Sequence, residues 1–465
     1  MALAYEEALD YVYSLINYEL QRPVRYTPDV VSLERPRALM AALGSPQERY
    51  PVIHVTGTKG KGSVSAMCAS VLQAAGLKVA LYSSPHLQDF RERFRINNTL
   101  IAPEAFAALV DRIKPLVAQI PGLTWFEVVT SIGFEYFAQQ AVDVAVIEVG
   151  LGGRLDATNI LQKPLVSVIT SLSYDHMYLL GNTLAEIAFE KCGIIKAGVP
   201  VVSAPQHAEG REVIERIAAE RGAPLTLVGR DWQSVTGKSD LNGQTFMAGK
   251  AEPLQTYWTP LIGEHQAINA TVALAALDQV RIAGLPLSSK ITDEAIHSGL
   301  QTVNWPGRIE IVERAPWLVL DVAHNAESAE RLTQALTSIL PGGGWTLVFG
   351  AFTDKDVDGM FRTLLPLTEH LVVMKALNPR AFDTDVLADK ARAMGFTGTI
   401  DAIPAVAEAL ARARELAASS NADSKQARIL VTGSVSIVGE MRAILGLAPT
   451  RSAYLDQQAV QALQG

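Results

Sequence analysis

Residues 51–76 read PVIHVTGTKGKGSVSAMCASVLQAAG and give the clearest indication of the fold class. A short run rich in β-branched residues leads into a glycine-rich turn, and the turn opens a longer run that predicts a helix. A loop between a strand and a helix binds phosphate through backbone N–H groups at the helix N-terminus, and a lysine adds its charge. We therefore predict a phosphate-binding loop made of Gly57, Thr58, Lys59, Gly60, Lys61, Gly62 and Ser63.

This loop departs from the spacing of the standard P-loop. Val55 stands where that pattern has its first glycine, and Gly62 separates Lys61 from Ser63. The alternative interpretation is a turn that is rich in glycine for steric reasons alone. The glycines, together with a lysine and a serine, exceed what a turn requires and favour phosphate binding.

The alternation of strand and helix continues along the chain. Residues 143–150 (DVAVIEVG) follow a helical stretch at 126–140, and residues 165–171 (LVSVITS) precede another at 183–198. Such alternation predicts an α/β fold with a mostly parallel sheet. The polar residues 234–249 predict a hairpin or surface loop.

A domain boundary is predicted where the helical pattern stops at residues 304–308, NWPGR. Strand and helix signals start again with IEIVE and WLVLDVAHN and continue to ARILVTGS. We predict a first domain at 1–300, an inter-domain linker at 301–308 and a second, smaller α/β domain at 309–465.

Composition excludes several classes of protein. The formal net charge of −8 gives no attraction to nucleic-acid backbones or anionic lipid. Two cysteines, Cys68 and Cys192, make neither a disulfide framework nor a zinc site. Glu6 and Glu7 stand where a signal peptide would carry cations, and no apolar run approaches membrane-spanning length. We expect a soluble cytoplasmic protein with no nucleic-acid or membrane partner.

A series of motifs resembles the dihydrofolate synthase/folylpolyglutamate synthase family, a branch of the Mur-type ATP-dependent amide ligases. The motifs run in the family's order over nearly the whole chain, to about Gly439. They are GTKGKGS (57–63), YSSPHLQDFRERFRIN (82–97), WFEVVTSIGFEYF (125–137), VAVIEVGLGGRLDATNI (144–160), SYDHMYLLGNTLAEIAFEKCGIIK (173–196), GEHQAINA (263–270), WPGRIEIV (305–312), LDVAHNAESAERL (320–332), GAFTDKD (350–356) and TGSVSIVGE (432–440).

The resemblance implies a fold and an activity. The first domain would be a P-loop-containing Mur-ligase ATPase domain that binds ATP and pterin, and the second a Rossmann-like glutamate ligase domain. The expected reaction joins L-glutamate to dihydropteroate, to reduced folates or to both through an acyl phosphate, in a monomer. Two other interpretations remain: a Mur-type ligase acting on another acid, and a nucleotide-binding switch that only senses ATP.

Magnesium is expected because a carboxylate must approach the γ-phosphate of ATP. Glu148 ends an apolar strand at its carboxyl edge, where α/β sheets bind ligands, and Ser63 could add a hydroxyl. By resemblance, Ser84 completes the first magnesium site and His176 binds a second ion. The resemblance also makes Lys191 a metal ligand after carbamylation by carbon dioxide, which turns a cation into an anion.

Nucleotide contacts are expected on both sides of the linker. Asn269 matches a family residue that contacts the nucleotide, and Arg308 follows the Trp-Pro-Gly turn, from which a guanidinium can stabilise phosphoryl charge. Asp321 and His324 end a strand of the second domain. The resemblance gives Asp321 a nucleotide contact and His324 the positioning of the γ-phosphate or glutamate. The predicted catalytic residues are Lys61, Lys191, Arg308 and His324.

The pterin side is also drawn from the resemblance. An aromatic face such as that of Phe126 can stack on a pterin, and a carboxylate such as that of Asp156 can pair with its donor edge. The expected substrate-binding residues are Thr27, Asp29, Trp125, Phe126, Glu127, Leu155, Asp156, Ala157 and Ser434. This chain departs from the family pattern at four positions. Ser32 replaces the usual glycine, Lys59 the commoner asparagine and Ala326 a proline, and Pro36 is unusual at its position.

Overall fold

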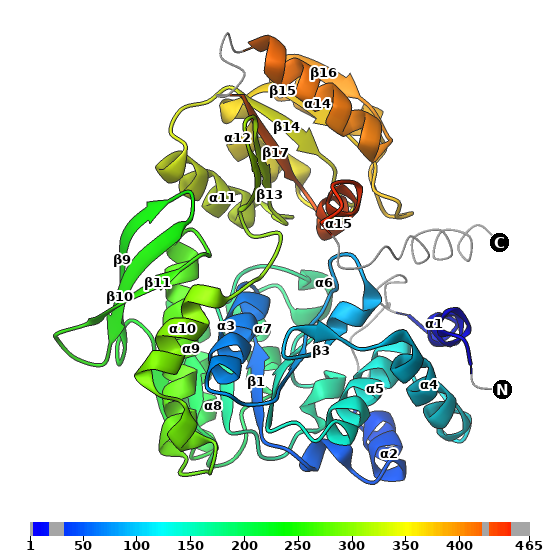
Figure 1. Cartoon of the computed structure of the whole chain (residues 1–465), viewed down its shortest axis with the longest axis vertical. Coiled ribbons are helices and arrows are strands. Elements are labelled where there is room, and N and C mark those ends of the chain that lie inside the picture. Colours follow the sequence, from blue (N-terminus) through cyan, green and yellow to red (C-terminus); the bar gives the residue numbers. More distant parts are fainter. Residues whose placement is uncertain (1–2, 18–31, 421–426, 448–465) are drawn as a thin grey trace.

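The computed structural model describes residues 3–17, 32–420 and 427–447. It has two parts, one below the other in Figure 1, and each part is a sheet covered by helices. The phosphate loop lies in the larger part, on the side that faces the smaller one. Among the described residues, no helix is long and apolar enough to cross a lipid bilayer.

The larger part is built on an eight-stranded sheet. Six strands are parallel, and β3 and β4 add an antiparallel edge. In spatial order the strands are β4 (Thr99–Leu100), β3 (Phe94–Ile96), β2 (Val79–Tyr82), β5 (Val144–Glu148), β1 (Val52–Thr56), β6 (Val166–Ile169), β7 (Val201–Ser203) and β8 (Leu225–Leu227).

Helices cover both faces of this sheet, because side chains of a buried strand alternate between the faces. Ile53 and Val55 of β1 pack in one hydrophobic cluster with α3, α9 and α10, whereas Val52 packs in a second cluster with α1, α2, α4 and α5. The helices of this part are α1 (Tyr5–Tyr13), α2 (Glu34–Ala42), α3 (Lys61–Ala74), α4 (Pro103–Val117), α5 (Trp125–Gln139), α6 (Met177–Leu180), α7 (Leu184–Cys192), α8 (Ala208–Glu220), α9 (Glu264–Ile282) and α10 (Asp293–Thr302).

A small antiparallel sheet extends from the larger part toward the smaller one (Figure 1). Its strands are β9 (Gln233–Asp240), β10 (Gly243–Gly249) and β11 (Gln255–Thr259). Of the two predicted alternatives for residues 234–249, a hairpin or a surface loop, the structure has the hairpin. At the hairpin tip, Asn242 Oδ1 accepts a 2.8 Å hydrogen bond from Arg314 of the smaller part. The hairpin is therefore a contact between the two parts.

The smaller part is a six-stranded sheet with helices on both faces. In spatial order the strands are β12 (Glu310–Arg314), β13 (Trp317–Leu320), β17 (Arg428–Thr432), β14 (Trp345–Phe349), β15 (Thr368–Val373) and β16 (Thr399–Ala402), all parallel except β12. The helices are α11 (Ala326–Ile339), α12 (Val357–Leu364), α13 (Thr384–Ala393), α14 (Val406–Ser420) and α15 (Val435–Ile444).

The predicted α/β class with mostly parallel sheets is confirmed. The second sheet begins with β12 at Glu310, shortly after the Trp-Pro-Gly turn. The boundaries at 300 and 309 stay predictions. A second contact between the parts lies near α15, where Arg442 Nε donates a 2.9 Å hydrogen bond to Gln88 Oε1.

Candidate active site

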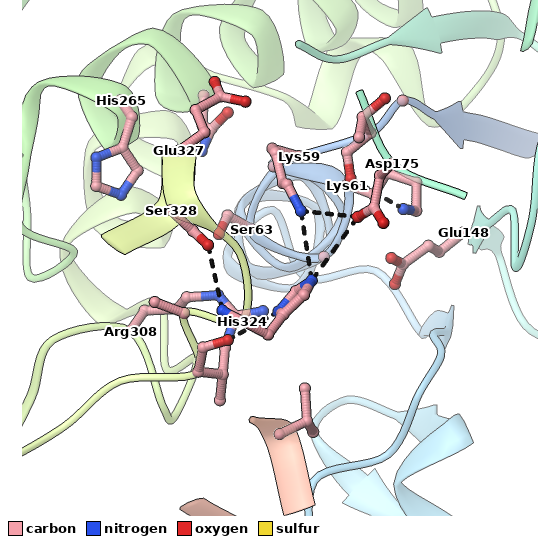
Figure 2. A pocket seen from close by; sticks show the side chains of 18 of the residues that line it. Lys59, Lys61, Ser63, Glu148, Asp175, His265, Arg308, His324, Glu327 and Ser328 are labelled. Carbon is pink, nitrogen blue, oxygen red and sulfur yellow. Dashed lines mark hydrogen bonds and ion pairs between the residues drawn. The ribbon is translucent and has the colours of Figure 1, made fainter. Parts of the chain in front are cut away.

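A cavity of about 260 Å³ lies between the two parts. The larger part lines it with the phosphate loop, the carboxyl end of β5 and the start of α9, and the smaller part with the end of β13 and the start of α11. Figure 2 shows charged side chains from both parts pointing into this space. The carboxyl ends of parallel strands thus face one another across the cavity, as α/β sheets place their ligand sites.

The phosphate loop needs its glycines. Gly57 has φ +146°, and a Cβ there would lie 1.9 Å from Thr170 Oγ1. Gly60 has φ +87°, and a Cβ there would lie 2.3 Å from Asn269 Oδ1. Backbone in these conformations strains residues with side chains, and the close approach excludes them. The sequence thus folds the loop tightly around the end of β1.

The backbone amides of the loop divide into two groups. Those of Thr58 and Lys59 donate to the carbonyl of Ser171, at 2.9 and 3.1 Å. Lys61, Gly62 and Ser63 form the first turn of α3, where an α-helix offers no acceptor for its own N–H groups. The first turn of α3 is therefore the part of the loop that is available to an anion.

Asn269 joins α9 to the phosphate loop. Its side chain is 6% exposed, its Nδ2 donates to Gln266 Oε1 at 3.1 Å, and its Oδ1 lies against Gly60. Lys61 Nζ is 3.5 Å from the carbonyl of Thr58. Both residues line the cavity, and their nucleotide contacts stay predictions.

Glu148 brings a buried carboxylate to the same cavity at the end of β5, as predicted from its position in the sequence. Burial raises the pKa of Glu148 to about 7, although the charge of Lys61 and the backbone N–H of Ser84 favour the carboxylate. Ser63 and Ser84 are also buried and line the cavity. One carboxylate and two hydroxyl side chains therefore gather beside Lys61.

Lys191 is buried, in contrast to the surface position that its helical neighbours alone would suggest. Its Nζ donates a 2.8 Å hydrogen bond to the carbonyl of Gly57. Burial lowers the pKa of Lys191 well below that of an exposed lysine, and the charge of Lys61 lowers it further. A larger fraction of such an amine is neutral than of an exposed lysine, and the neutral amine is the form that reacts with carbon dioxide.

His176 lies at the rim of the cavity, at the N-terminus of α6. Its side chain is 44% exposed, and its Nε2 is 3.9 Å from Asp175 Oδ1. Among the described residues, His, Cys, Asp and Glu side chains do not gather in threes as a metal cluster. A metal at this site would therefore also need hydroxyl or phosphate oxygens.

Arg308 and Asp321 connect the linker to the end of β13. Asp321 Oδ2 accepts a 2.9 Å hydrogen bond from the backbone of Ile309, and its Oδ1 accepts one of 2.8 Å from Ala323. Arg308 lines the cavity, and its charge acts on both Glu148 and Asp321. Arg308 Nη1 donates a 3.1 Å hydrogen bond to the carbonyl of Gly307, so the guanidinium is held by the linker itself.

His324 faces the phosphate loop from the smaller part (Figure 2). Its Nδ1 lies 2.9 Å from the carbonyl of Val322, and its Nε2 lies 3.3 Å from Lys59 Nζ. Ser434, predicted to bind substrate, is 2% exposed, and its hydroxyl accepts from the backbone of Ile437 at the start of α15. The described side chain of Ser434 therefore serves as a helix cap.

The predicted aromatic pair occupies two environments. Trp125 is 1% exposed and packs in the core, with Arg93 4.8 Å from its ring centroid. Phe126 is half-buried and covers Gly150, where a Cβ would lie 2.4 Å from its ring. Phe126 is the member of the pair with surface left to stack on a ligand.

The two carboxylates predicted to bind the pterin, those of Glu127 and Asp156, already form hydrogen bonds or ion pairs with neighbouring residues. Glu127 caps α5 and forms an ion pair of 3.1 Å with Arg35. Asp156 is buried and accepts from Gly150, Leu151 and Thr158. Leu155 is half-buried and Ala157 is buried beside it. Thr27 and Asp29 lie outside the described residues.

Several residues of the cavity region were not among the predictions. Asp175 precedes His176 in the loop after β6, and His265 opens α9; both line the cavity. Lys355 lies beside Asp175, 3.6 Å from its Oδ1. Asp175 follows a strand just as His176 does, and this position was the available signal. Lys355 belongs to a motif of the resemblance, but nothing in its spacing placed it opposite the phosphate loop.

Comparison with known proteins agrees with this arrangement. Residues 127–277 match the Mur ligase middle domain, and residues 307–435 match the Mur ligase glutamate ligase domain. The chain is 36% identical to the dihydrofolate synthase/folylpolyglutamate synthase of Bacillus subtilis, with 78% of this chain and 83% of that protein covered. It is 35% identical to the protein of that name from Mycobacterium tuberculosis, with 90% and 91% covered.

Solved structures give the same result. The folylpolyglutamate synthase of Mycobacterium tuberculosis complexed with ADP has a TM-score of 0.85 and 33% identity, with 96% of this chain and 99% of that chain covered. E. coli FolC in complex with DHPP and ADP has a TM-score of 0.81 and 30% identity, with 96% and 98% covered.

Fold and site together define an ATP-dependent ligase of the Mur type, which forms amide bonds. The glutamate ligase match contains every strand of the smaller part's sheet, and the middle-domain match contains β5, β6, β7 and β8 of the larger sheet. The relatives extend the likeness over nearly the whole chain. The chain belongs to the dihydrofolate synthase/folylpolyglutamate synthase family.

Proposed function

We propose that this ligase adds L-glutamate both to dihydropteroate and to reduced folates. The observation that carries the proposal is the meeting of the first turn of α3, Glu148 and Lys191 in one cavity between the two parts. A protein that only senses ATP has no use for a buried carboxylate and a buried amine there. The names of the relatives, which join both activities, support the choice of acceptors.

The proposed reaction has two steps. An oxygen of the acceptor carboxylate attacks the γ-phosphorus of ATP, the bond to the bridging oxygen breaks, and ADP leaves. The α-amine of glutamate then attacks the acyl carbon of the acyl phosphate, gives up a proton, and expels phosphate. Activation replaces a poor leaving group by a good one, and two parts that enclose the intermediate exclude water from it.

The chain's own cations would stabilise the charge that moves during the first step. Lys61 lies at the first turn of α3, and Arg308 reaches the cavity from the linker. His324 would orient the γ-phosphate or glutamate from the smaller part. Preorganised donors of this kind act on the transition state without having to reorganise.

Magnesium fits the residues that gather here. A buried carboxylate next to hydroxyl groups supplies the hard oxygen ligands that magnesium prefers. The pKa of Glu148 is raised because its buried carboxylate is poorly solvated, so a bound cation would stabilise the anion. We propose that Ser63, Ser84 and Glu148 hold one ion, and His176 with carbamylated Lys191 a second. Bound magnesium would withdraw charge from the phosphate oxygens. Monomeric state and cytoplasmic location stay predictions.

Transfer of oxygen tests this mechanism directly. Dihydropteroate labelled with ¹⁸O in its carboxylate is incubated with ATP, magnesium and L-glutamate, and the mass of the phosphate product is measured by mass spectrometry. An acyl phosphate passes one labelled oxygen to phosphate, since the C–O bond breaks in the second step. Amide product formed with unlabelled phosphate would refute the acyl phosphate, and the absence of product with either pterin would refute the proposed acceptors.

A further inference from the structure

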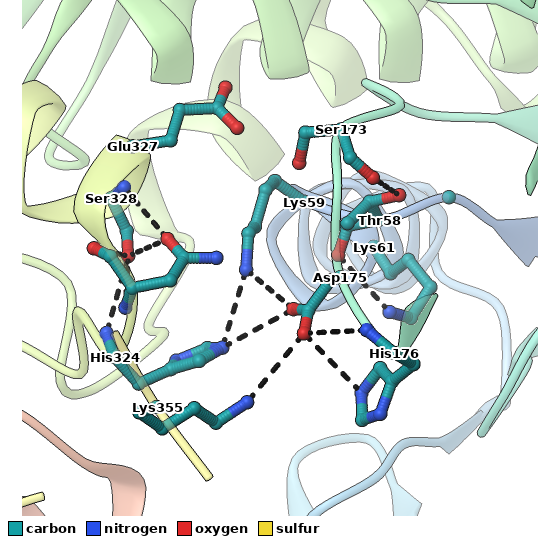
Figure 3. Close-up of polar contacts among 12 residues, drawn as sticks. Thr58, Lys59, Lys61, Ser173, Asp175, His176, His324, Glu327, Ser328 and Lys355 are labelled. Atoms are coloured by element: carbon teal, nitrogen blue, oxygen red, sulfur yellow. Dashed lines mark hydrogen bonds and ion pairs between the residues drawn. The ribbon is translucent and has the colours of Figure 1, made fainter. Parts of the chain in front are cut away.

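Asp175 lies between the two parts of the protein and contacts both (Figure 3). It belongs to the loop that joins β6 to α6 in the larger part, and its side chain is 14% exposed. Its Oδ2 is 2.9 Å from Lys59 Nζ in the phosphate loop. Its Oδ1 is 3.6 Å from Lys355 Nζ, which comes from the loop between β14 and α12 in the smaller part.

His324 adds a second connection across the cavity. A carbonyl can only accept, so His324 Nδ1 carries the proton that it donates to Val322 at 2.9 Å. The neutral ring then has a lone pair on Nε2, which accepts from Lys59 Nζ at 3.3 Å. Lys59 therefore donates to a residue of each part, to Asp175 and to His324.

The charges of this cluster depend on Asp175. The charge of Lys355 acts on Lys59, and the carboxylate of Asp175 pairs with both lysines. Lys355 is also 3.8 Å from Asp354, but Asp354 forms an ion pair of 2.7 Å with Arg380. Asp175 is thus a carboxylate that contacts both ammonium groups where the parts meet.

We propose that Asp175 is a positioning residue that holds the smaller part closed over the phosphate loop through Lys59 and Lys355. The proposal deepens the proposed function, on which its kinetic consequences rest. Asp175 acts through the two lysines. It fixes Lys59 beside the first turn of α3, and it holds Lys355 and His324 of the glutamate ligase domain next to the phosphate loop. Without the carboxylate, two like charges face each other in a half-buried place and drive the parts apart.

Repulsion makes the test specific. Asp175→Asn keeps the shape of the side chain and removes its charge, so the two parts should separate. Adding Lys59→Met removes one of the two repelling cations, and the double variant should close again. A residue that only supports the local loop would not be rescued in this way.

Small-angle X-ray scattering of the full chain without substrates measures the closure. We expect a larger radius of gyration for Asp175→Asn than for wild type, and a return toward the wild-type value for Asp175→Asn with Lys59→Met. Asp175→Glu, which keeps the charge, should match wild type. The matched control is Glu220→Gln, which removes an exposed ion pair within α8 and should change nothing. An unchanged radius in Asp175→Asn, or no return in the double variant, would overturn the proposal.

Kinetics give a second, independent measurement. Asp175→Asn should lower kcat/KM for glutamate about tenfold, and the loss should be smaller when Lys59→Met is already present, because the two residues act together. Additive losses would contradict the coupling. If Asp175→Asn does not fold, Asp175→Ser takes its place, and it should also enlarge the radius of gyration because it removes the same carboxylate. If wild type shows no ligase turnover, the proposed function fails while the scattering result still decides the role of Asp175.

Discussion

Lys191 donates a 2.8 Å hydrogen bond to the carbonyl of Gly57, so the last turn of α7 is joined to the start of the phosphate loop. The two residues are 134 positions apart in the sequence. The amine is buried next to the place proposed for the phosphates, and its pKa is lowered by that burial. A lysine in this position is suited to carbamylation, because only the neutral amine attacks carbon dioxide.

Activity should depend on carbon dioxide if Lys191 becomes a carbamate. Enzyme held in degassed buffer below pH 7 should lose most of its turnover, since carbamates decompose in acid, and added bicarbonate at neutral pH should restore it. The ¹³C NMR spectrum with labelled bicarbonate should contain one carbamate signal that is absent in Lys191→Met. Full turnover in the absence of carbon dioxide would remove the carbamate from the account.

Glu148→Ala should fold and lose turnover. The substitution takes away the one carboxylate that we place on the first magnesium ion, and we expect kcat to fall by at least about a hundredfold. Circular dichroism checks the fold, and Glu220→Ala on the exposed face of α8 is the control that should keep full activity. Wild-type turnover in Glu148→Ala would exclude Glu148 from the mechanism.

Stability without magnesium should fall as pH rises toward 7, because of Glu148. Its pKa is raised from 4.5 to about 7, so the folded protein keeps a proton that the unfolded chain has already released. The stabilisation is complete below pH 4.5 and is lost as pH rises to about 7, which amounts to about 3 kcal/mol. Urea unfolding at several pH values, compared with Glu148→Gln, measures it. A difference between the two proteins that does not vary with pH would contradict the raised pKa.

Gly60→Ala should weaken nucleotide binding by about tenfold or more. A Cβ at this position would lie 2.3 Å from Asn269 Oδ1, so either the loop or the amide has to move. Gly76→Ala is the matched control: Gly76 has a similar φ of +75°, and a Cβ there meets nothing within 4 Å. It should lose about 1 kcal/mol of stability from the backbone and keep its nucleotide affinity. Calorimetric titration with ADP compares the two, and equal affinities would contradict the role of the loop.

The sequence was informative wherever chemistry follows directly from local order. Residues 52–63 predicted a strand, a tight loop and a helix start, and Glu148 was placed at the cavity by its position at a strand end. A hairpin was one of two alternatives predicted for residues 234–249. Its contact with Arg314 of the smaller part was not predicted, since that contact depends on how two separately folded sheets meet.

Long-range relations account for most of what the sequence missed. Asp175 meets Lys355 only because the loops that follow β6 and β14 face each other, and no periodicity in either segment indicates that. Lys191 was placed in the site by the resemblance alone, because a lysine in a helix is ordinarily exposed and its burial depends on how α7 packs. Glu127 matches a substrate-binding motif, but the structure gives its carboxylate to a helix cap and to Arg35.

We propose that one site joins glutamate to two kinds of pterin. The deciding measurement is the release of phosphate from ATP by the purified chain in the presence of magnesium, with dihydropteroate or tetrahydrofolate, each with and without L-glutamate. We expect release that requires glutamate and occurs with either pterin. Folded protein that releases phosphate with neither pterin, or releases it equally without glutamate, would refute the proposed function.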